Sequence, residues 1–286
     1  MIDFSLTDEQ RMLVEMTHDF VEKEMLPHEE TLERTDALPP ELAESLKKRA
    51  IELGLHACNL PEEVGGGGLD AVSVMLIEKE LGRTSLALAE CAHRPLNILA
   101  SCEGEQVTQF LEPTVRGEKR DCIAMTEPGA GSDLRGMKCK AERVGDDWVI
   151  NGEKHFISQA SVSDYCVLFA ATGSEAFEDQ TVKAPRKYIS AFLVDFSDPG
   201  VEVAPGYKNV SHRGYTNNIL RFDNARIPQW RIMGPEGDGF RLVNQWLGPT
   251  RLTVAATCVA RAERAFEIAL NYASTREQFG QKIGKF

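Results

Sequence analysis

The composition is that of an ordinary globular protein. The chain has 286 residues, of which 42% are hydrophobic and 27% charged, which is enough for a sizeable core and predicts about two domains. Its 32 basic and 44 acidic residues give a formal net charge of −12, which argues against broad binding to nucleic acid or anionic membranes. No run of about 18 apolar residues occurs and the start lacks the features of a secretory signal, so we expect neither a membrane span nor secretion.

Cysteine and histidine usage indicates the compartment and the absence of a metal site. Seven cysteines are scattered through the chain without a CxxC pair, so we expect buried thiols in a reducing compartment. With no presequence at the start, this favours a bacterial cytoplasm, or the mitochondrial matrix for a eukaryotic protein. The six histidines show no metal-ligand spacing, and we expect no bound metal.

The first third of the chain carries helix signals. Thr7 is placed to cap one helix, Pro40 to open a second and Asp70 to cap a third. Apolar residues at helical spacing follow each of them. We predict two further helices, over 85–102 and over 106–115.

A β pattern begins near Arg120. The turn at 145–147 separates two strand-like runs, and Asn151-Gly152 predicts a two-residue hairpin turn. Further strands are predicted over 165–171, 189–195 and 218–222. The polar stretch 172–186 has no periodicity, and we predict a mobile surface loop there.

Helices return after the β region. Residues 238–273 form a long helical pattern that Gly248-Pro249 interrupts, which predicts a kink or a break. So long a helix, followed by only a short stretch, has too few partners to cover its apolar face. We expect an α+β protein with a helical domain over 1–118, an antiparallel β barrel or sandwich over 119–228, and an incomplete helical domain over 229–286.

One glycine-rich segment carries most of the functional information. Residues 124–133 read A-M-T-E-P-G-A-G-S-D, directly after an apolar strand. Such a loop lets backbone N–H groups approach an anion or a flat ring without interference from Cβ atoms. It is neither a phosphate-binding loop with Gly-Lys-Ser/Thr nor a GxGxxG turn that opens a helix. A hairpin end without a ligand is the alternative reading.

Five segments in the same order resemble the flavin-dependent acyl-CoA dehydrogenases. The first, T-E-P-G-A-G-S-D, resembles the signature loop of that family, and the second, N-G-E-K-H-F-I-S, resembles its second flavin segment. The others resemble the strand that leaves the β domain, the start of the following helix, and a segment that reaches the flavin of a neighbouring subunit. In chain order the five segments are 126–133, 151–158, 222–228, 237–240 and 276–280.

The resemblance implies FAD as the cofactor and names the residues that would hold it. Phe156 stands where the family has Trp over the flavin ring, and Ser158 replaces a Thr that donates toward flavin N5; a core aromatic is the alternative for Phe156. Arg276 and Phe279 would contact the FAD of a partner subunit, which predicts a homodimer or homotetramer, although Arg276 is also compatible with a solvated helix end. The remaining implied FAD contacts are Ile123, Ala124, Met125, Thr126, Gly131 and Ser132.

On the substrate side, the resemblance implies an acyl-CoA thioester. Ser132 and Arg251 are carried over as substrate-binding residues, with a structural ion pair as the alternative for Arg251. The implied reaction is α,β-desaturation, in which a Glu removes the α-proton and the β-hydrogen leaves as hydride to flavin N5. A minority of the family places this Glu where Thr250 stands, and most place it at a position that would lie beyond Phe286. We therefore expect no catalytic base in this chain and a shortened C-terminal domain.

Three functional readings remain open on the sequence alone. The first is an acyl-CoA dehydrogenase that passes electrons to an electron-transfer flavoprotein or a similar carrier. The second is an acyl-CoA oxidase or an enoyl-CoA reductase on the same scaffold. The third is a catalytically incomplete subunit that binds flavin or acyl-CoA. Glu127 and Glu267 are the candidate replacement bases, and we favour neither.

Overall fold

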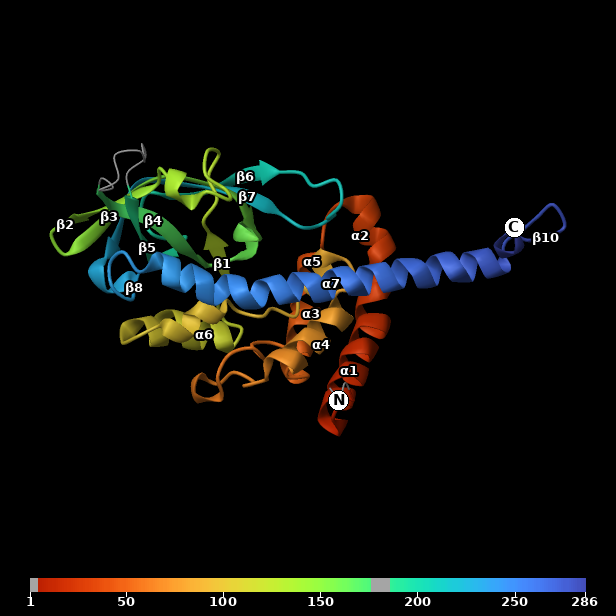
Figure 1. Ribbon diagram of the computed structural model, residues 1–286. Coiled ribbons are helices and arrows are strands. Elements are labelled where there is room, and N and C mark those ends of the chain that lie inside the picture. The colour runs from red at the N-terminus through yellow and green to blue at the C-terminus, as the bar shows by residue number, and fades with distance from the viewer. Residues whose placement is uncertain (1–4, 176–185) are drawn as a thin grey trace.

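The computed structural model describes residues 5–175 and 186–286. Helices gather on one side of a central sheet, and one long helix, α7, runs past both (Figure 1). The class expected from the sequence, α+β with helical, β and helical parts in that order, is confirmed. The N-terminal helices are α1 (Asp8–Phe20), α2 (Glu29–Thr35), α3 (Pro40–Glu52), α4 (Ala71–Leu81), α5 (Leu86–Ala89) and α6 (Glu112–Val115).

The predicted helix starts lie where the capping residues place them. The Thr7 hydroxyl accepts from the Gln10 backbone N–H and the Gln10 side chain accepts from Thr7 N–H, both at 3.1 Å. The Asp70 carboxylate accepts from the backbone of Val72 and Ser73. Behind these caps, one face of each helix is buried in a shared core that includes Phe20, Leu46, Ile77, Leu81 and Leu88.

The helix predicted over 85–102 is wrong in its middle. Only α5 and a short 3-10 segment, Asn97–Ser101, are helical. Pro95 lies between them and disfavours helical backbone at the residue before it. The Leu96 N–H donates at 2.8 Å to the carboxylate of Asp121, so a distant strand takes the donor that a helix would have used.

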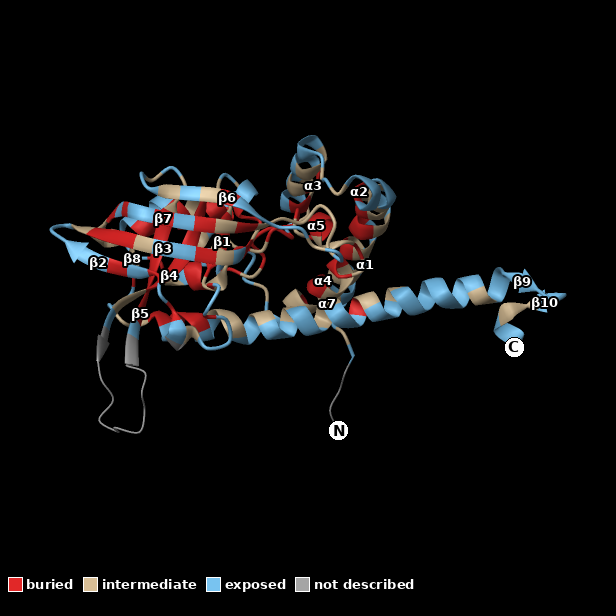
Figure 2. Ribbon diagram, turned by 90° about the horizontal axis from the view of Figure 1, so that it is seen from above, coloured by how far each residue is buried: buried red, intermediate tan, exposed pale blue. Residues whose placement is uncertain are grey.

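The central sheet has eight strands and is mostly antiparallel. The strand order is β6-β7-β3-β2-β4-β5-β8, with β1 beside β4, and the pairings β1–β4 and β2–β4 are parallel. A buried core that includes Tyr165, Phe169 and Phe192 supports it, as the central strands of Figure 2 show. The strands are β1 (Asp121–Ala124), β2 (Lys140–Val144), β3 (Asp147–Ser158), β4 (Tyr165–Glu175), β5 (Arg186–Asp195), β6 (Val201–Tyr207), β7 (Asn217–Pro228) and β8 (Ile232–Met233).

The hairpin predicted at Asn151-Gly152 is wrong. Strand β3 continues through both residues, and its register against β7 shifts between Ile150 and Gly152. Gly152 has a φ of 141°, and a Cβ there would lie 2.6 Å from the Cα of Cys139. The glycine therefore serves a bulge and a close backbone approach rather than a turn.

The loop predicted over 172–186 is wrong at its two ends. Strand β4 extends to Glu175 and β5 begins at Arg186, so the ends of this stretch are strand. Residues 176–185 lie outside the described part of the chain.

The prediction that the cysteines are buried is wrong for one of them, because six of the seven are buried but Cys258 is exposed.

Helix α7 (Gly239–Thr275) is continuous through Pro249, so of the predicted kink or break, the break is wrong. Proline has no N–H for the carbonyl four residues earlier, that of Gln245. Asn97 supplies the missing donor, because its side-chain amide donates to Gln245 O at 2.9 Å. Beyond Ala260, most of the helix is exposed (Figure 2), as expected for a helix with few partners.

Two short strands follow α7 at the end of the described chain. Strands β9 (Glu277–Gln278) and β10 (Gln281–Lys282) form a small hairpin after α7. Within residues 5–175 and 186–286, no helix is both long and apolar enough to cross a membrane.

Candidate active site

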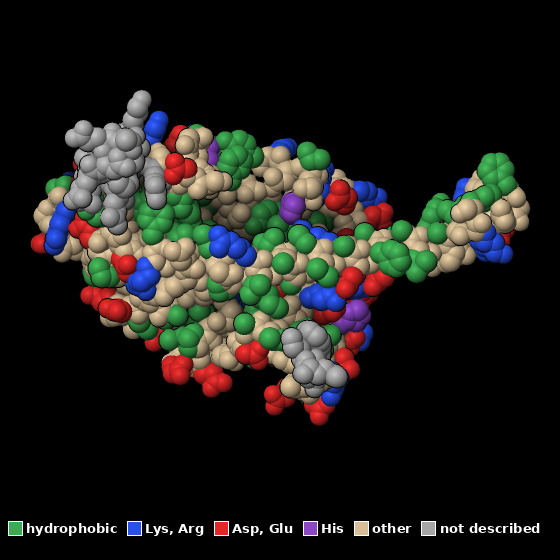
Figure 3. Space-filling model, in the orientation of Figure 1, with side chains coloured by type: hydrophobic (Ala, Val, Ile, Leu, Met, Phe, Trp, Pro, Cys, Tyr) green, Lys and Arg blue, Asp and Glu red, His purple; other side chains and the backbone are tan. Residues whose placement is uncertain are grey.

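A large cleft opens between the N-terminal helices, the sheet and α7. Its volume is about 1350 Å³, and Figure 3 shows the hollow beside α7. It is lined by α4, the segment around His93, strand β1 with the loop after it, the end of β3, and α7. Helix packing brings α7 close to this space, because a Cβ on Gly82 would lie 2.8 Å from the Cα of Thr257.

The glycine-rich loop and the end of β3 are joined by hydrogen bonds. The backbone N–H of His155 donates to Thr126 O at 2.8 Å. The Lys154 ammonium donates to Met125 O at 3.0 Å and to the Glu127 carboxylate at 2.7 Å. Two segments separated by more than twenty residues therefore form one wall of the cleft.

The Glu127 carboxylate is a structural group. It is buried with Lys154, whose side chain is fully buried, and also accepts from the backbone N–H groups of Lys138 and Cys139. Burial raises the pKa of Glu127, but the hydrogen bonds and the charge of Lys154 outweigh burial and hold it below its ordinary value. Glu267 is exposed and paired with Arg83 at 2.8 Å. Both candidate replacement bases are thus engaged elsewhere.

Most of the residues predicted to form the site line this one cleft. Phe156 and Ser158 reach it from the end of β3, and Arg251 reaches it from α7. Ala124 is different, because its side chain is fully buried in the core. The cleft-lining residues from the glycine-rich segment are Ile123, Met125, Thr126, Gly131 and Ser132.

Arg276 and Phe279 lie far from the cleft of their own chain. They follow the end of α7, at the far tip of the molecule (Figure 1). Phe279 is 94% exposed. This geometry leaves both residues available to another subunit, and their contact with FAD stays a prediction.

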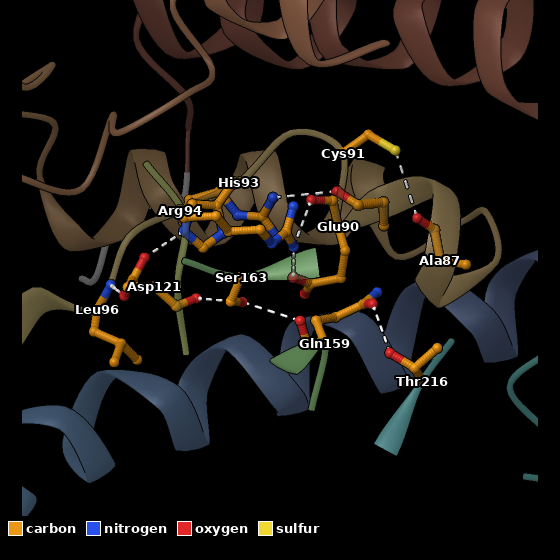
Figure 4. Close-up of polar contacts among 12 residues, drawn as sticks. Ala87, Glu90, Cys91, His93, Arg94, Leu96, Asp121, Gln159, Ser163 and Thr216 are labelled. Carbon is orange, nitrogen blue, oxygen red and sulfur yellow. Dashed lines mark hydrogen bonds and ion pairs between the residues drawn. The ribbon is translucent and has the colours of Figure 1, made fainter. Parts of the chain in front are cut away.

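A polar wall, which sequence reasoning missed, faces the same cleft. His93 Nε2 lies 2.5 Å from the Asp121 carboxylate (Figure 4). Arg120 donates to Glu90 at 3.2 Å. Arg94 forks onto Glu78 at 2.6 and 3.1 Å. These partners come from α4, from the segment after α5 and from the start of β1, so no local spacing could have revealed them.

Among the described residues, the three carboxylates that line the cleft are all in such pairs. Burial raises the pKa of Asp121, but the charge and hydrogen bond of His93 lower it overall. Glu78 and Glu90 each have an arginine partner. The cleft can therefore bind and orient a ligand, but none of these described carboxylates is a free base. In the described part of the chain, no group of three or more His, Cys, Asp or Glu is arranged to hold a metal ion.

Comparison with known proteins defines the family. Family models described as the N-terminal, middle and C-terminal domains of acyl-CoA dehydrogenase match residues 7–118, 122–225 and 237–286. A probable acyl-CoA dehydrogenase, YngJ of Bacillus subtilis, is 34% identical over 292 residues, covering 100% of this chain and 73% of its own. The chain belongs to the acyl-CoA dehydrogenase family, oxidoreductases that act on CH–CH groups.

Two solved structures share the fold. An acyl-CoA dehydrogenase from Bacillus anthracis, complexed with FAD, is 30% identical with a TM-score of 0.86 and covers 100% of this chain and 48% of its own. A structure from Acidaminococcus fermentans, described as an electron transferring flavoprotein, is 30% identical with a TM-score of 0.83. The match covers 100% of this chain and 73% of that chain.

Proposed function

We propose that this protein binds FAD in the cleft and desaturates an acyl-CoA thioester between its α and β carbons. The observation that carries the proposal is the single wall formed by the glycine-rich loop and the end of β3. Without the bond from His155 N to Thr126 O and those made by Lys154, these segments would not present one surface. The FAD-bound relative supports the same cofactor for this chain.

The residues present fit a flavin nucleotide. Gly131 leaves open space where a Cβ would stand, which allows a ligand to approach the backbone. Met125 and Thr126 are proposed to contact the flavin ring, Phe156 to cover one face, and the Ser158 hydroxyl to donate toward N5. When bound, FAD supplies a hydride acceptor for the β-hydrogen.

The chain's own cleft residues would bind and orient the substrate. Ser132 and Arg251 are proposed to hold the acyl-CoA. Since Glu78, Glu90 and Asp121 are ion-paired, we propose that the α-proton is taken by a Glu outside this set, in line with the expectation of a base beyond Phe286.

We also propose that the protein works as a homodimer or homotetramer. Arg276 and Phe279 cannot serve the cleft of their own chain from the tip of α7. An arginine and an aromatic ring suit the pyrophosphate and adenine of a neighbour's FAD.

We propose an electron-transfer flavoprotein as the electron acceptor, in line with the Acidaminococcus relative. We also propose that the boundaries between the three domains lie near residues 118 and 228.

The test combines FAD titration with anaerobic addition of acyl-CoA. We expect a bound flavin with a yellow absorbance band that bleaches when a suitable acyl-CoA is added without oxygen. Prompt reoxidation by air would favour an oxidase, and flavin binding without bleaching by a panel of acyl-CoAs would favour a catalytically incomplete subunit. A protein that acquires no flavin band on addition of FAD would contradict the proposal.

A further inference from the structure

Phe156 and Tyr207 form a stacked aromatic pair beside the cleft. Their ring centroids are 4.4 Å apart and their planes are inclined by 18°. Phe156, which lines the cleft, is 54% exposed and Tyr207 is 43% exposed. Two large rings thus remain half in solvent, so burial in the core does not explain their arrangement.

The backbone at both rings is irregular. Phe156 has a φ of 58°, a left-handed conformation that is rare for a bulky side chain. The register of β3 against β7 shifts between Lys154 and Ile157, and that of β6 against β7 shifts between Ala204 and Tyr207. Strained backbone that core packing does not explain is typical of residues held in place for a ligand.

A glycine makes the second irregularity possible. A Cβ on Gly206 would lie 1.7 Å from the carbonyl oxygen of Asn217 on β7. Only glycine therefore allows β6 to approach β7 closely just before Tyr207. The local sequence thus admits the bulge that brings the Tyr207 ring over to Phe156.

Tyr207 is also tied to the residue next to Phe156. Its hydroxyl oxygen lies 2.8 Å from His155 Nδ1. His155 in turn donates its backbone N–H to Thr126 O at 2.8 Å. The stacked ring and this hydroxyl contact both restrain Phe156 relative to the glycine-rich loop.

We propose that Tyr207 is a positioning residue that holds the Phe156 ring against the flavin ring of bound FAD. The inference rests on the proposed function, because Phe156 is the residue proposed to cover the flavin. A phenyl ring stacked on one face and still half exposed presents a fixed, flat apolar surface to a planar ligand. Without Tyr207, the Phe156 ring would still be present beside the cleft but would lose its fixed orientation.

The experiment measures the dissociation constant of FAD and the visible circular dichroism of the bound flavin in the full chain. A flavin held against a fixed ring lies in an asymmetric surrounding, so Phe156→Ala should change the circular-dichroism band of the flavin and weaken FAD binding by about fivefold. Tyr207→Ala should change both in the same direction, and the double variant should add little to Phe156→Ala alone. Tyr207→Phe should restore most of the natural band and affinity because it keeps the ring.

The matched control is Phe240→Ala, which removes a half-exposed ring on α7 that does not line the cleft. It should leave the circular-dichroism band of the flavin unchanged. Thermal unfolding of the FAD-free variants separates a structural role, because loss of stability without a change in the flavin band in Tyr207→Ala overturns this inference. Failure of the unchanged protein to bind FAD overturns the proposed function as well, whereas normal binding with an unaltered flavin band in Tyr207→Ala overturns this inference alone.

Discussion

At the scale of single residues, the buried pair of Lys154 and Glu127 joins the two segments on which the site depends. Lys154 is fully buried, and its ammonium is satisfied by the Glu127 carboxylate and by Met125 O. A buried charge left without its partner is far more costly than one exposed to water. The pair therefore couples the geometry of the cleft to the stability of the sheet.

We predict that Lys154→Met lowers the free energy of unfolding by about 3 kcal/mol, because Glu127 is left buried and without its counter-ion. Urea denaturation at neutral pH measures the effect. Lys140→Met is the control, since it breaks an exposed pair with Glu142 and should change the free energy by less than about 1 kcal/mol. Equal effects of the two substitutions would contradict this role for the buried pair.

At the scale of elements, the course of α7 depends on contacts from other parts of the chain. Pro249 removes one helix hydrogen bond, and Asn97 replaces it at Gln245 O. We predict that Asn97→Ala costs about 1 kcal/mol of stability in the natural chain. The cost should shrink in the Pro249→Ala background, because an alanine there has the backbone N–H that proline lacks. A double-mutant cycle by urea denaturation measures this coupling, and additive effects would rule it out.

Another contact of α7, made by Arg264, fixes it to α2. Arg264 forks onto Glu29 at 2.6 and 2.8 Å. Burial raises the pKa of Glu29, but the hydrogen bonds from Arg264 and Thr84 outweigh burial and hold it below its ordinary value of 4.5. A lowered folded-state pKa means that this stabilisation is complete above pH 4.5 and is lost as the pH falls through the folded-state value.

We therefore predict that Glu29→Gln destabilises the protein at about pH 7 and that its difference from the natural chain shrinks toward about pH 3. Urea denaturation at several pH values measures this difference. Glu30→Gln is the control, because Glu30 is exposed and has only a 3.6 Å contact with Arg34. A difference that stays constant over this pH range would show that the charge of Glu29 is not responsible.

At the scale of the whole molecule, the outer part of α7 extends away from the rest of the chain (Figure 1). Phe266, Ile268, Leu270 and Tyr272 on this part are all more than half exposed. An exposed apolar surface of this kind is typical of a site of association. It agrees with the proposal that each FAD site is completed by a second subunit.

We predict that Arg276→Ala weakens FAD binding by about tenfold, because a charge-assisted hydrogen bond to phosphate is lost. The effect should appear although Arg276 lies far from the cleft of its own chain. FAD titration followed by absorbance, with sedimentation at the same concentrations, measures binding and assembly together. Lys285→Ala is the control, and unchanged FAD affinity in an assembled Arg276→Ala protein would remove Arg276 from the site.

Much of the fold could be predicted from local signals. Thr7, Pro40 and Asp70 mark helix starts because caps act through atoms only two or three residues away. The segments around Thr126 and Phe156 indicated the family because a motif is recognised from the order of its residues, without knowledge of the contacts that those residues make. The helix predicted through Pro95 and the hairpin turn predicted at Asn151-Gly152 are wrong because residues far along the chain, Asp121 and Cys139, influence the conformation there.

The sequence by itself determined the order of helical and β regions and the family, and most of the site residues that it predicted line the cleft. Only the tertiary structure decided that Gly152 forms a bulge, that α7 continues through Pro249 and that His93 meets Asp121 at the cleft. The physical reason is the range of the interactions: a cap or a turn is satisfied within a few residues, whereas buried polar groups take whatever partner the folded chain brings to them.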